Sequence, residues 1–571
     1  MPGEKRRLAF FALLIAAFAL LSYSQFFGIR LLEFDAVGKI ASHSSRSPAE
    51  IINILTQPEQ NYTLISTNYR PVQTLIQWAV FLLFGFDFSA FHWLNFLFHA
   101  VNSVLVFFVA RKLLGDKPGF FSFLAGLVFA LHPIHLNTVL FVSRLHEPLV
   151  AFALLSSLLC LGRYFERKKR VFFLLSFLFC AMGVFSKETG SLIPFVLFFY
   201  ALVFSREKRF RNAFSSSLRF CLPFFSLVAL YAAMMFFSLG RAGGYLSFAP
   251  AAPGFIAFSF FQFLVYPFDF LKAGFLESAR PALTYGFSGI VFFVAILALS
   301  IVAAKFLSES RERKPALFLF CWLIVFLLAF SASGFIGAWY SYVPAIPFSM
   351  LLAFLLRVHC NNSKKSNLSR LAVAIIGLLV FSIVFFSPLF TDYPAPREAA
   401  DATQSILGQT LLAAKDLPDG ARLYLVNCPS YLFSEQLGFR NAILLVNESS
   451  AKAFLDFFAP DKNFKLFPIT AVSIFSHPQD VNLDFRWKGN CVFVVENLDT
   501  KSAKNYLPVS AVNGPNMAKG VTFRPPQYGA GTEPIEIEFW KSEDWRDSFL
   551  LVFEGGRASA ISISEFCKAE S

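Results

Sequence analysis

The stretch "FHWLNFLFHAVNSVLVFFVARKLLG" (residues 91–115) decides the class of fold. Its apolar part, at about 90–110, is long enough to cross ~30 Å of hydrocarbon as a helix. The run ends at Arg111 and Lys112, and basic residues are typical of the cytoplasmic end of a membrane span. The stretch therefore predicts a transmembrane helix and its direction.

Four polar side chains interrupt this run at helical spacing. His92, Asn95, His99 and Asn102 follow one another at i, i+3, i+7 and i+10, so they share one face of the helix. Polar side chains on one face of a membrane helix most often hydrogen-bond to neighbouring helices. We therefore expect a structural role for them, with only His92, at the outer end, close to a site. Two His seven residues apart without a carboxylate are weak evidence for a metal.

The whole chain has the composition of a polytopic membrane protein. Of its 571 residues, 56% are hydrophobic and 77 are Phe, which lies outside the range of soluble domains. Apolar runs of spanning or nearly spanning length predict eleven transmembrane helices. The first run follows a basic cluster without an obvious cleavage site, so we expect an uncleaved span rather than a signal peptide. The runs lie at about 8–28, 90–110, 120–140, 148–164, 171–185, 191–204, 218–239, 286–305, 315–333, 342–357 and 370–390.

Basic clusters predict the orientation of these helices. They recur at every second loop, as the positive-inside rule requires, and so face the cytoplasm. Segment 254–270 is apolar, but a full span there would break the alternation, so we expect an interfacial or re-entrant helix. The basic clusters lie at the N-terminus and at 111–117, 163–170, 205–219, 305–314 and 357–370. The loops expected to face outward are 29–89, 141–147, 186–190, 240–285, 334–341 and everything after about 391.

The residues after about 391 differ from the rest. From Asp392 onward 17 Lys and Arg stand against 22 Asp and Glu, a net charge of −5, so the preceding residues carry +18; the basicity belongs to the membrane part and does not indicate nucleic-acid binding. Short β-rich runs separated by Pro, Gly, Asn and Asp predict a compact α/β or mainly-β domain. We therefore expect a transmembrane domain over 1–391 and an extracytoplasmic soluble domain over 392–571.

The eight Cys show no CxxC pair and no metal-ligand spacing. Most of them lie in or beside apolar runs, which favours small core residues over a metal or redox site.

Polar residues gather at the ends of spans that face outward. Ionisable groups near a bilayer are costly unless they are paired or wetted, so such a gathering is a functional signal. The alternative is that these are outer-loop residues that only pair with one another. The residues are Asp35 and those in "NYRP" (68–71), "HPIH" (132–135), "SRLHEP" (143–148), "SKETG" (186–190) and "WYSYVP" (339–344).

Several of these stretches carry a resemblance to a known family. "FDAVGKI" (34–40), "NYRPV" (68–72), "LVFALHPIHLNTVLFVSRLHEPL" (127–149), "FSKETGSLIP" (185–194) and "WYSYVPAIPFSMLLA" (339–353) occur in a characteristic order and spacing. They resemble the transmembrane O-mannosyltransferases that carry TPR repeats, and their bacterial relatives. The chain is thereby identified as similar to the GT-C glycosyltransferase superfamily, with a β-rich tail in place of TPR repeats.

The resemblance implies inverting transfer of a sugar, mannose among the candidates, from a polyprenyl-phosphate donor to an acceptor protein or envelope glycan on the outer face. A carboxylate must take the acceptor proton and fixed cations must stabilise the leaving phosphate. Asp35 is the expected base, with Glu33 in reserve because Ala36 occupies the place of the family's second acid. A lone Asp gives no support for a divalent metal, and no other cofactor is indicated. The implied localisation is a prokaryotic inner membrane.

The remaining site residues have expected roles of two kinds. Arg144, Lys187 and Arg70 are expected to bind the donor phosphate, because Arg holds two phosphate oxygens and Lys acts as a point charge. The other candidates orient these cations, or hydrogen-bond to sugar or acceptor; they are Glu147, Glu188, His132, Tyr69, Tyr340 and Tyr342.

Two other classes of function stay open. No Walker lysine motif, GxSxG or HExxH is present, so a soluble-type ATPase, serine hydrolase or zinc protease is unsupported. A transporter would suit eleven spans, but no inverted repeat is seen. A non-catalytic relative that binds lipid-linked sugar is the other alternative, motivated by Ala36.

Overall fold

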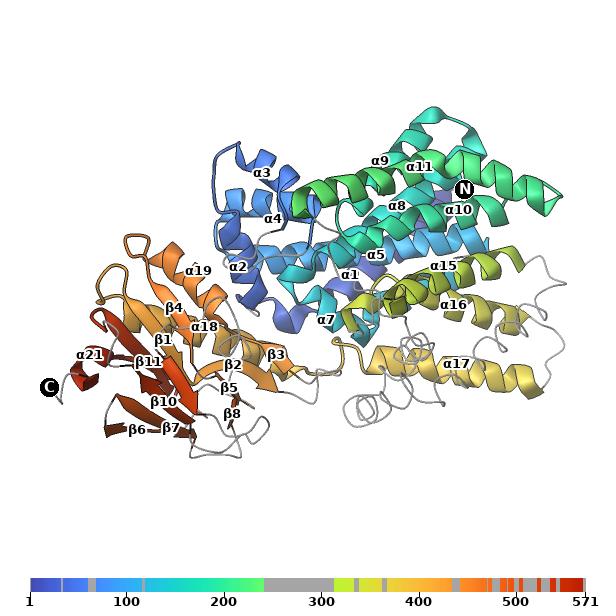
Figure 1. The fold of residues 1–571 in the computed structure, drawn as a ribbon. Helices are drawn as coiled ribbons and strands as arrows, with labels where there is room; N and C mark the ends of the chain where they lie inside the picture. Colours follow the sequence, from blue (N-terminus) through green and yellow to red (C-terminus); the bar gives the residue numbers. More distant parts are fainter. Residues whose placement is uncertain are drawn as a thin grey trace.

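A computed structural model gives the fold of the chain (Figure 1). Helices up to residue 385 form an elongated bundle, and a region that contains β-sheets lies at one end of it. The residues described are 2–31, 34–59, 68–115, 119–240, 313–332, 338–361, 367–433, 442–469, 471–474, 483–489, 491–497, 503–506, 521–524, 535–540 and 545–567.

Helices form where the apolar runs were predicted. Ten of the eleven predicted runs overlap a described helix; the eleventh, 286–305, and segment 254–270 lie outside the described residues. The helices are α1 (Pro2–Leu21), η1 (Ser24–Phe26), α2 (Phe34–Ser42), α3 (Glu50–Thr56), α4 (Pro71–Phe84), α5 (Phe88–Leu114), α6 (Phe120–Leu131), η2 (Pro133–His135), α7 (Leu136–Val139), η3 (Val142–Arg144), α8 (His146–Arg167), α9 (Arg170–Val184), η4 (Glu188–Leu192), α10 (Ile193–Val203), α11 (Phe210–Leu239), α15 (Arg313–Ala332), η5 (Ala338–Ser341), α16 (Ala345–Asn361) and α17 (Asn367–Phe385).

Three helical segments in the described ranges are long and apolar enough to cross a membrane: Phe88–Leu114, Val142–Arg167 and Phe210–Leu239. A fourth is a pair, Phe120–Leu131 and Pro133–Val139, bent by 42°. The bend falls at Pro133, because the residue before a proline is disfavoured in helical conformation and proline lacks an N–H. The other apolar helices among these residues are shorter, so the count of eleven spans stays a prediction.

Local sequence signals set the ends of α5. The Asp87 side chain caps its N-terminus by accepting a hydrogen bond from the backbone N–H of Ser89 at 3.0 Å. Gly115 ends the helix with a φ of 60°, a left-handed conformation that glycine adopts without a side-chain clash.

The polar stripe of α5 faces neighbouring helices, as predicted. The Asn95 amide donates to the carbonyl of Phe141 at 2.9 Å, and that of Asn102 to the carbonyl of Pro148 at 2.9 Å. The two ring nitrogens of His99 bond to the hydroxyl of Tyr342 and the carbonyl of Ala130. The stripe therefore holds α5 against the segments that follow α6 and η5.

The predicted outer loop 29–89 has more structure than the sequence indicated. It contains α2, α3 and the 14-residue helix α4, at the end of the bundle next to the sheet region. Helix α4 is apolar but shorter than a span, which is why its sequence did not predict a membrane helix.

In the part of the C-terminal region that the structure describes, helices combine with three four-stranded sheets. Strand β1 pairs in parallel with β11 and β4, and β2 pairs in parallel with β5, so of the two predicted classes the described part is α/β. The sheets have the orders β12-β11-β1-β4, β6-β7-β10-β9 and β3-β2-β5-β8. The elements are α18 (Pro394–Ala414), β1 (Arg422–Val426), β2 (Cys428–Phe433), β3 (Ala442–Leu444), α19 (Glu448–Phe458), β4 (Lys465–Pro468), β5 (Ala471–Ile474), β6 (Leu483–Gly489), β7 (Val492–Asn497), β8 (Ala503–Tyr506), β9 (Val521–Arg524), β10 (Ile535–Phe539), β11 (Ser548–Glu554), β12 (Arg557–Ser562) and α21 (Ile563–Cys567).

Helix α19 joins this region to the bundle. It packs against α2, and the two helices contribute to one continuous apolar core. Phe457 of α19 lies 3.9 Å from Phe86, between the centroids of the two rings. The C-terminal region therefore rests on the helix that begins with Phe34 and Asp35.

One prediction about the cysteines was wrong. Cys491 and Cys567 form a disulfide that ties α21 to the start of β7. They are 76 residues apart, so no spacing motif could indicate the pairing. The other six Cys are free, and Cys180, Cys221 and Cys428 are buried, as expected of small core residues.

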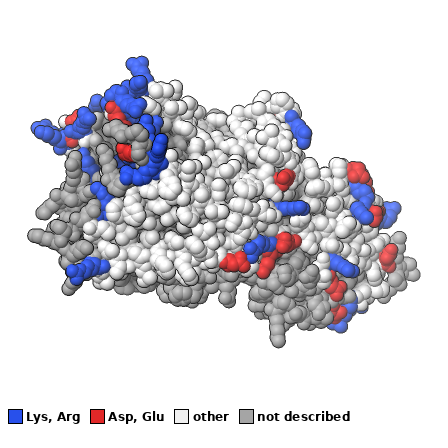
Figure 2. Space-filling view, turned by 180° about the vertical axis from the view of Figure 1, so that it is seen from behind, with Lys and Arg blue, Asp and Glu red and all other residues white. Residues whose placement is uncertain are grey.

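Charged side chains are distributed unevenly over the surface. Figure 2 shows Lys and Arg gathered at the end of the bundle away from the C-terminal region, with a broad uncharged belt next to them. This is the arrangement expected of a membrane protein whose basic loops lie on one side.

Candidate functional site

The predicted site residues come from loops and helix ends at the end of the bundle that carries α2. Asp35 and Lys39 lie on α2, Arg70 precedes α4, and Arg144 ends η3. Glu147 is in the first turn of α8, and Lys187 and Glu188 begin η4. These segments are far apart in the sequence, and the fold joins their side chains through the contacts described below.

Lys187 and Glu147 form a buried ion pair. Their side chains are 2% and 0% exposed, so neither charge is solvated by bulk water. The Lys187 ammonium also lies 4.5 Å from the ring centroid of Tyr340. Burial lowers the pKa of Lys187, and Glu147 opposes that shift only in part.

A close backbone contact fixes the loop that carries Lys187. Gly190 lies so tightly against the backbone carbonyl of Gly183 that a Cβ at position 190 would overlap it. The backbone N–H of Ser186 donates to the same carbonyl at 3.1 Å. The glycine of the "SKETG" stretch is therefore required for the loop to reach the site.

A second buried network links α2, α4 and η4. Glu59 lies 2.9 Å from the Lys39 ammonium and 3.6 Å from the Arg70 guanidinium. Arg70 also donates to Glu188 at 3.1 Å. Burial would raise the pKa of Glu59, but Lys39 and Arg70 together hold it below its ordinary value. Burial likewise opposes the charge on Lys39, yet Glu59 and Asp35 keep the pKa of Lys39 raised.

Arg144 is the most accessible of the three predicted phosphate-binding cations. Arg144 is partly exposed, whereas Arg70 and Lys187 are buried. The guanidinium stacks over Phe141 at 3.9 Å and Trp339 at 4.2 Å, and it donates to the backbone carbonyl of Asn137. Stacking between two aromatic rings holds the planar fork in one orientation.

His146 lies among these cations. Its Nδ1 is 2.8 Å from the side-chain oxygen of Gln73, and the imidazole is buried. Charge interactions reach it from four bases on separate segments, namely Lys187, Arg70, Lys39 and Arg144. The four cations therefore all lie within electrostatic range of this one imidazole.

Asp35 lies at the edge of the charged cluster. The residues of this cluster are Lys39, Glu59, Arg70, Arg144, Glu147, Lys187 and Glu188. It is in the first turn of α2, partly exposed, and interacts electrostatically with Lys39 one turn further on. A carboxylate in a first helical turn is favoured by the helix dipole. Glu33, the reserve candidate, lies outside the described residues.

Three other predicted residues lie in the core. The Tyr69 hydroxyl donates to the carbonyl of Leu55 at 2.7 Å, and Tyr342 bonds to the polar stripe of α5. His132 is fully buried and its Nδ1 accepts from the backbone N–H of Ile134 at 3.2 Å. Each of these contacts supports the backbone near the site.

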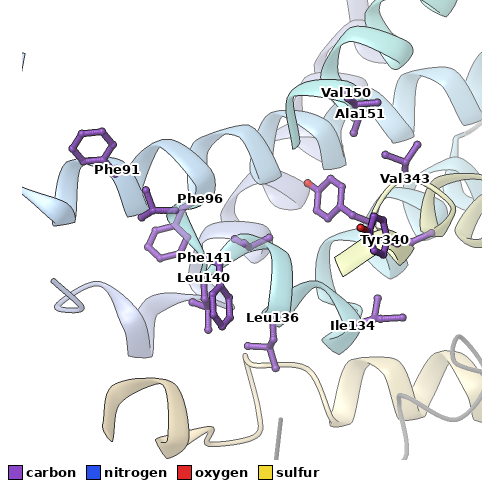
Figure 3. Packing of buried hydrophobic residues seen from close by; sticks show 14 of the residues in the cluster. Phe91, Phe96, Ile134, Leu136, Leu140, Phe141, Val150, Ala151, Tyr340 and Val343 are labelled. Atoms are coloured by element: carbon purple, nitrogen blue, oxygen red, sulfur yellow. The ribbon is translucent and has the colours of Figure 1, made fainter. Parts of the chain in front are cut away.

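The core beneath the site is apolar (Figure 3). Phe96 of α5 lies beside Leu140 and Phe141, and Tyr340 lies near Val343. Two of these residues also contact the cations, since the rings of Phe141 and Tyr340 lie against Arg144 and Lys187.

Sequence reasoning missed the roles of Glu59, Gln73 and His146. Glu59 lies in the loop 29–89, where no spacing pattern separates it from other polar residues. His146 immediately precedes Glu147, and a His beside a candidate acid was the one available signal. In the described part of the chain, no group of three or more His, Cys, Asp or Glu is arranged to hold a metal ion.

Comparison with known proteins defines the class. Residues 68–238 match the family of dolichyl-phosphate-mannose-protein mannosyltransferases. This range contains Arg70, Arg144, Glu147, Lys187 and Glu188 of the charged cluster. The resemblance to membrane O-mannosyltransferases is thereby confirmed over this part of the chain, and a glycosyltransferase is the class of enzyme it indicates.

The individual relatives are transmembrane O-mannosyltransferases. Human protein O-mannosyl-transferase TMTC2 is 34% identical over 147 residues, which are 25% of this chain and 17% of that protein. Human protein O-mannosyl-transferase TMTC3 is 33% identical over 111 residues, 19% of this chain and 12% of that protein. The similarity thus covers less than a fifth of either relative.

Solved structures of two other membrane glycosyltransferases are also similar. The apo oligosaccharyltransferase of Archaeoglobus fulgidus is 14% identical, with a TM-score of 0.42 over 84% of this chain and 73% of that chain. ArnT from Cupriavidus metallidurans, bound to undecaprenyl phosphate, is 14% identical with a TM-score of 0.43, over 82% and 92% of the two chains.

Proposed function

We propose that this chain transfers a sugar from a polyprenyl-phosphate donor to an acceptor on the extracytoplasmic face, with inversion at the anomeric carbon. The observation that carries the proposal is the pair of buried ion-pair networks, Lys187 with Glu147 and Glu59 with Lys39 and Arg70, beside the carboxylate of Asp35 at the start of α2. An anionic leaving group requires such fixed cations, and an attacking hydroxyl requires such a base.

The three predicted phosphate-binding cations differ in how deeply they are buried. Arg144 is partly exposed and held flat between two rings, so it suits direct contact with two phosphate oxygens. Lys187 and Arg70 are buried and paired with Glu147 and Glu188, so both cations are held in fixed positions. Because the carboxylates already hold these cations in place, little reorganisation is needed as negative charge develops on the phosphate.

Asp35 is the general base in this proposal. It accepts the proton of the acceptor hydroxyl while that oxygen bonds to the anomeric carbon, and the bond from that carbon to the phosphate oxygen breaks. Lys39 lies within electrostatic range of Asp35, one helical turn away on α2. The donor leaves as polyprenyl phosphate, which carries the electron pair of the broken bond.

The disulfide between Cys491 and Cys567 supports the proposed orientation. Disulfides form and persist in oxidising compartments, which include the bacterial periplasm and the cell surface. The acidic C-terminal region is next to α2, so both belong on the outer side if the basic loops face the cytoplasm.

The decisive assay incubates the purified full chain with a panel of radiolabelled polyprenyl-phosphate sugars. Release of polyprenyl phosphate that depends on one sugar identifies the donor. Bound donor without release would favour the non-catalytic relative, and movement of a solute across proteoliposomes without sugar transfer would favour the transporter.

Asp35→Asn then tests the base. The amide cannot accept the proton, so transfer should fall by roughly 100-fold or more while donor binding persists. Arg144→Ala should weaken donor binding itself. Asp87→Asn is a matched control in the same loop, since Asn caps a helix as well as Asp. If Asp35→Asn keeps full transfer activity in an active enzyme, Asp35 is not the general base. If Glu33→Gln loses transfer activity, the general base is Glu33.

A further inference from the structure

A cavity of about 520 Å³ lies between α5 and α8, at their basic ends. The candidate site described above lies at the other end of α8, where this helix begins at His146. The cavity is therefore separate from the candidate site, and no function proposed above uses it.

One part of the cavity is positively charged. Among the described residues, Arg111, Lys112 and Arg163 line it together with the acid Glu166, and Arg111 pairs with Glu4. Lys112 pairs with Glu166, whose side chain is 60% exposed, and such a surface pair is weak and easily exchanged. Among the described residues Arg163 has no ion-pair partner.

The other part is apolar and leads towards the hydrocarbon. Leu105, Phe108 and Leu159 line it, and Leu105 precedes Arg111 by six residues, about 9 Å along the helix axis. Phe108 continues an exposed apolar stripe on α5, in which residues four and seven apart share one face. The other members are Trp93, Leu97 and Val101.

We propose that this cavity binds an anionic glycerophospholipid of the leaflet that faces the basic loops. Its phosphate lies against Arg163, Lys112 and Arg111, and an acyl chain follows Phe108 along α5. Three bases against Glu166 and Glu4 leave a net positive charge among the described residues, which favours an anionic over a zwitterionic headgroup, and basic pockets between membrane helices are suited to such headgroups. The apolar stripe favours a lipid over a free anion.

Gly162 gives this site a specific test. A Cβ at position 162 would overlap the Cε atom of Lys112, which crosses the glycine. Gly162→Ala therefore moves the Lys112 ammonium without changing any charge. Because the overlapping atom is the far end of a flexible side chain, the helix itself can stay folded.

Native mass spectrometry of the purified full chain measures the binding. Phosphatidylglycerol is titrated against phosphatidylcholine with the same acyl chains, and inorganic phosphate forms a third arm. Arg163→Ala should weaken phosphatidylglycerol binding about fivefold, as expected for one cation near an anionic headgroup. Gly162→Ala should also weaken it, and Arg206→Ala, an exposed base outside the cavity, should not.

Each other outcome overturns the proposal. Equal binding of both lipids would show that the charge is not recognised. Unchanged binding in Arg163→Ala, or an equal loss in Arg206→Ala, would show a diffuse effect of the basic end. Inorganic phosphate that competes at the concentration of phosphatidylglycerol would make this a site for a soluble anion.

Discussion

Glu59→Gln is the sharpest test of the charged cluster, because one carboxylate faces two buried cations. The side chains of Glu59 and Arg70 are 3% exposed and that of Lys39 is 11% exposed. Glutamine keeps the shape of the side chain but removes its charge. Lys39 then keeps the partly exposed Asp35 nearby, and Arg70 keeps Glu188.

The expected cost follows from the distances. At an effective dielectric constant of about 20, separations of 2.9 and 3.6 Å correspond to attractions of about 6 and 5 kcal/mol. Part of this lost attraction is offset, because the free-energy cost of burying the Glu59 carboxylate is removed as well. Loss of one partner from a buried ion pair costs about 3–5 kcal/mol in net stability. We therefore expect Glu59→Gln to be destabilised by an amount in that range.

The assay is thermal unfolding of the purified full chain in detergent, together with the yield of monodisperse protein. Glu50→Gln is the matched control, because it makes the same substitution at a buried Glu that bonds to the His43 imidazole at 2.7 Å and not to a Lys or Arg. Adding Lys39→Met to Glu59→Gln should recover part of the loss, since one uncompensated charge is removed. If Glu59→Gln unfolds at the same temperature as the unaltered chain and Glu50→Gln, the cations around Glu59 are solvated by water. The burial of the charged cluster is then refuted.

Two further predictions concern pH and the contact of the C-terminal region. The folded state lowers the pKa of Glu59 from 4.5, so Glu59 stabilises the fold above pH 4.5 and loses this contribution as the pH falls through the folded value. Unfolding temperatures measured from pH 6 downward should therefore fall more steeply in the unaltered chain than in Glu59→Gln, and parallel curves would contradict this. Phe457→Ala removes the ring that packs on Phe86, so hydrogen exchange in the peptide that covers 34–42 should accelerate, whereas Trp487→Ala, a change at an exposed ring on β6, should leave it unchanged. Unchanged exchange in Phe457→Ala would show that α19 does not hold α2 in place.

The membrane helices could be predicted because their signals are local. The spacing of His92, Asn95, His99 and Asn102 indicated hydrogen bonds to neighbouring helices, and the bonds of Asn95, His99 and Asn102 confirm it. The family resemblance was found in the same way, from short stretches in order.

Features that depend on distant contacts could not be predicted. Glu59 becomes important only because the fold brings Lys39 and Arg70 to it from either side of the loop. Cys491 and Cys567 meet through sheet packing, with no spacing rule to reveal them. The roles of Asp35, Arg144 and Lys187 in catalysis stay predictions, because geometry places charges but measures no turnover.

The shared core of α19 and α2 implies thermodynamic coupling between the C-terminal region and the proposed base. Asp35 is carried by a helix whose buried face, with Ala36, Val37 and Ile40, belongs to the same core as Leu455 of α19. Any acceptor that binds the C-terminal region and shifts α19 must change the equilibrium position of α2. By reciprocity, an occupied donor site that shifts α2 must change the affinity for that acceptor by the same factor. Acceptor selection and proton abstraction would then depend on the same conformational equilibrium.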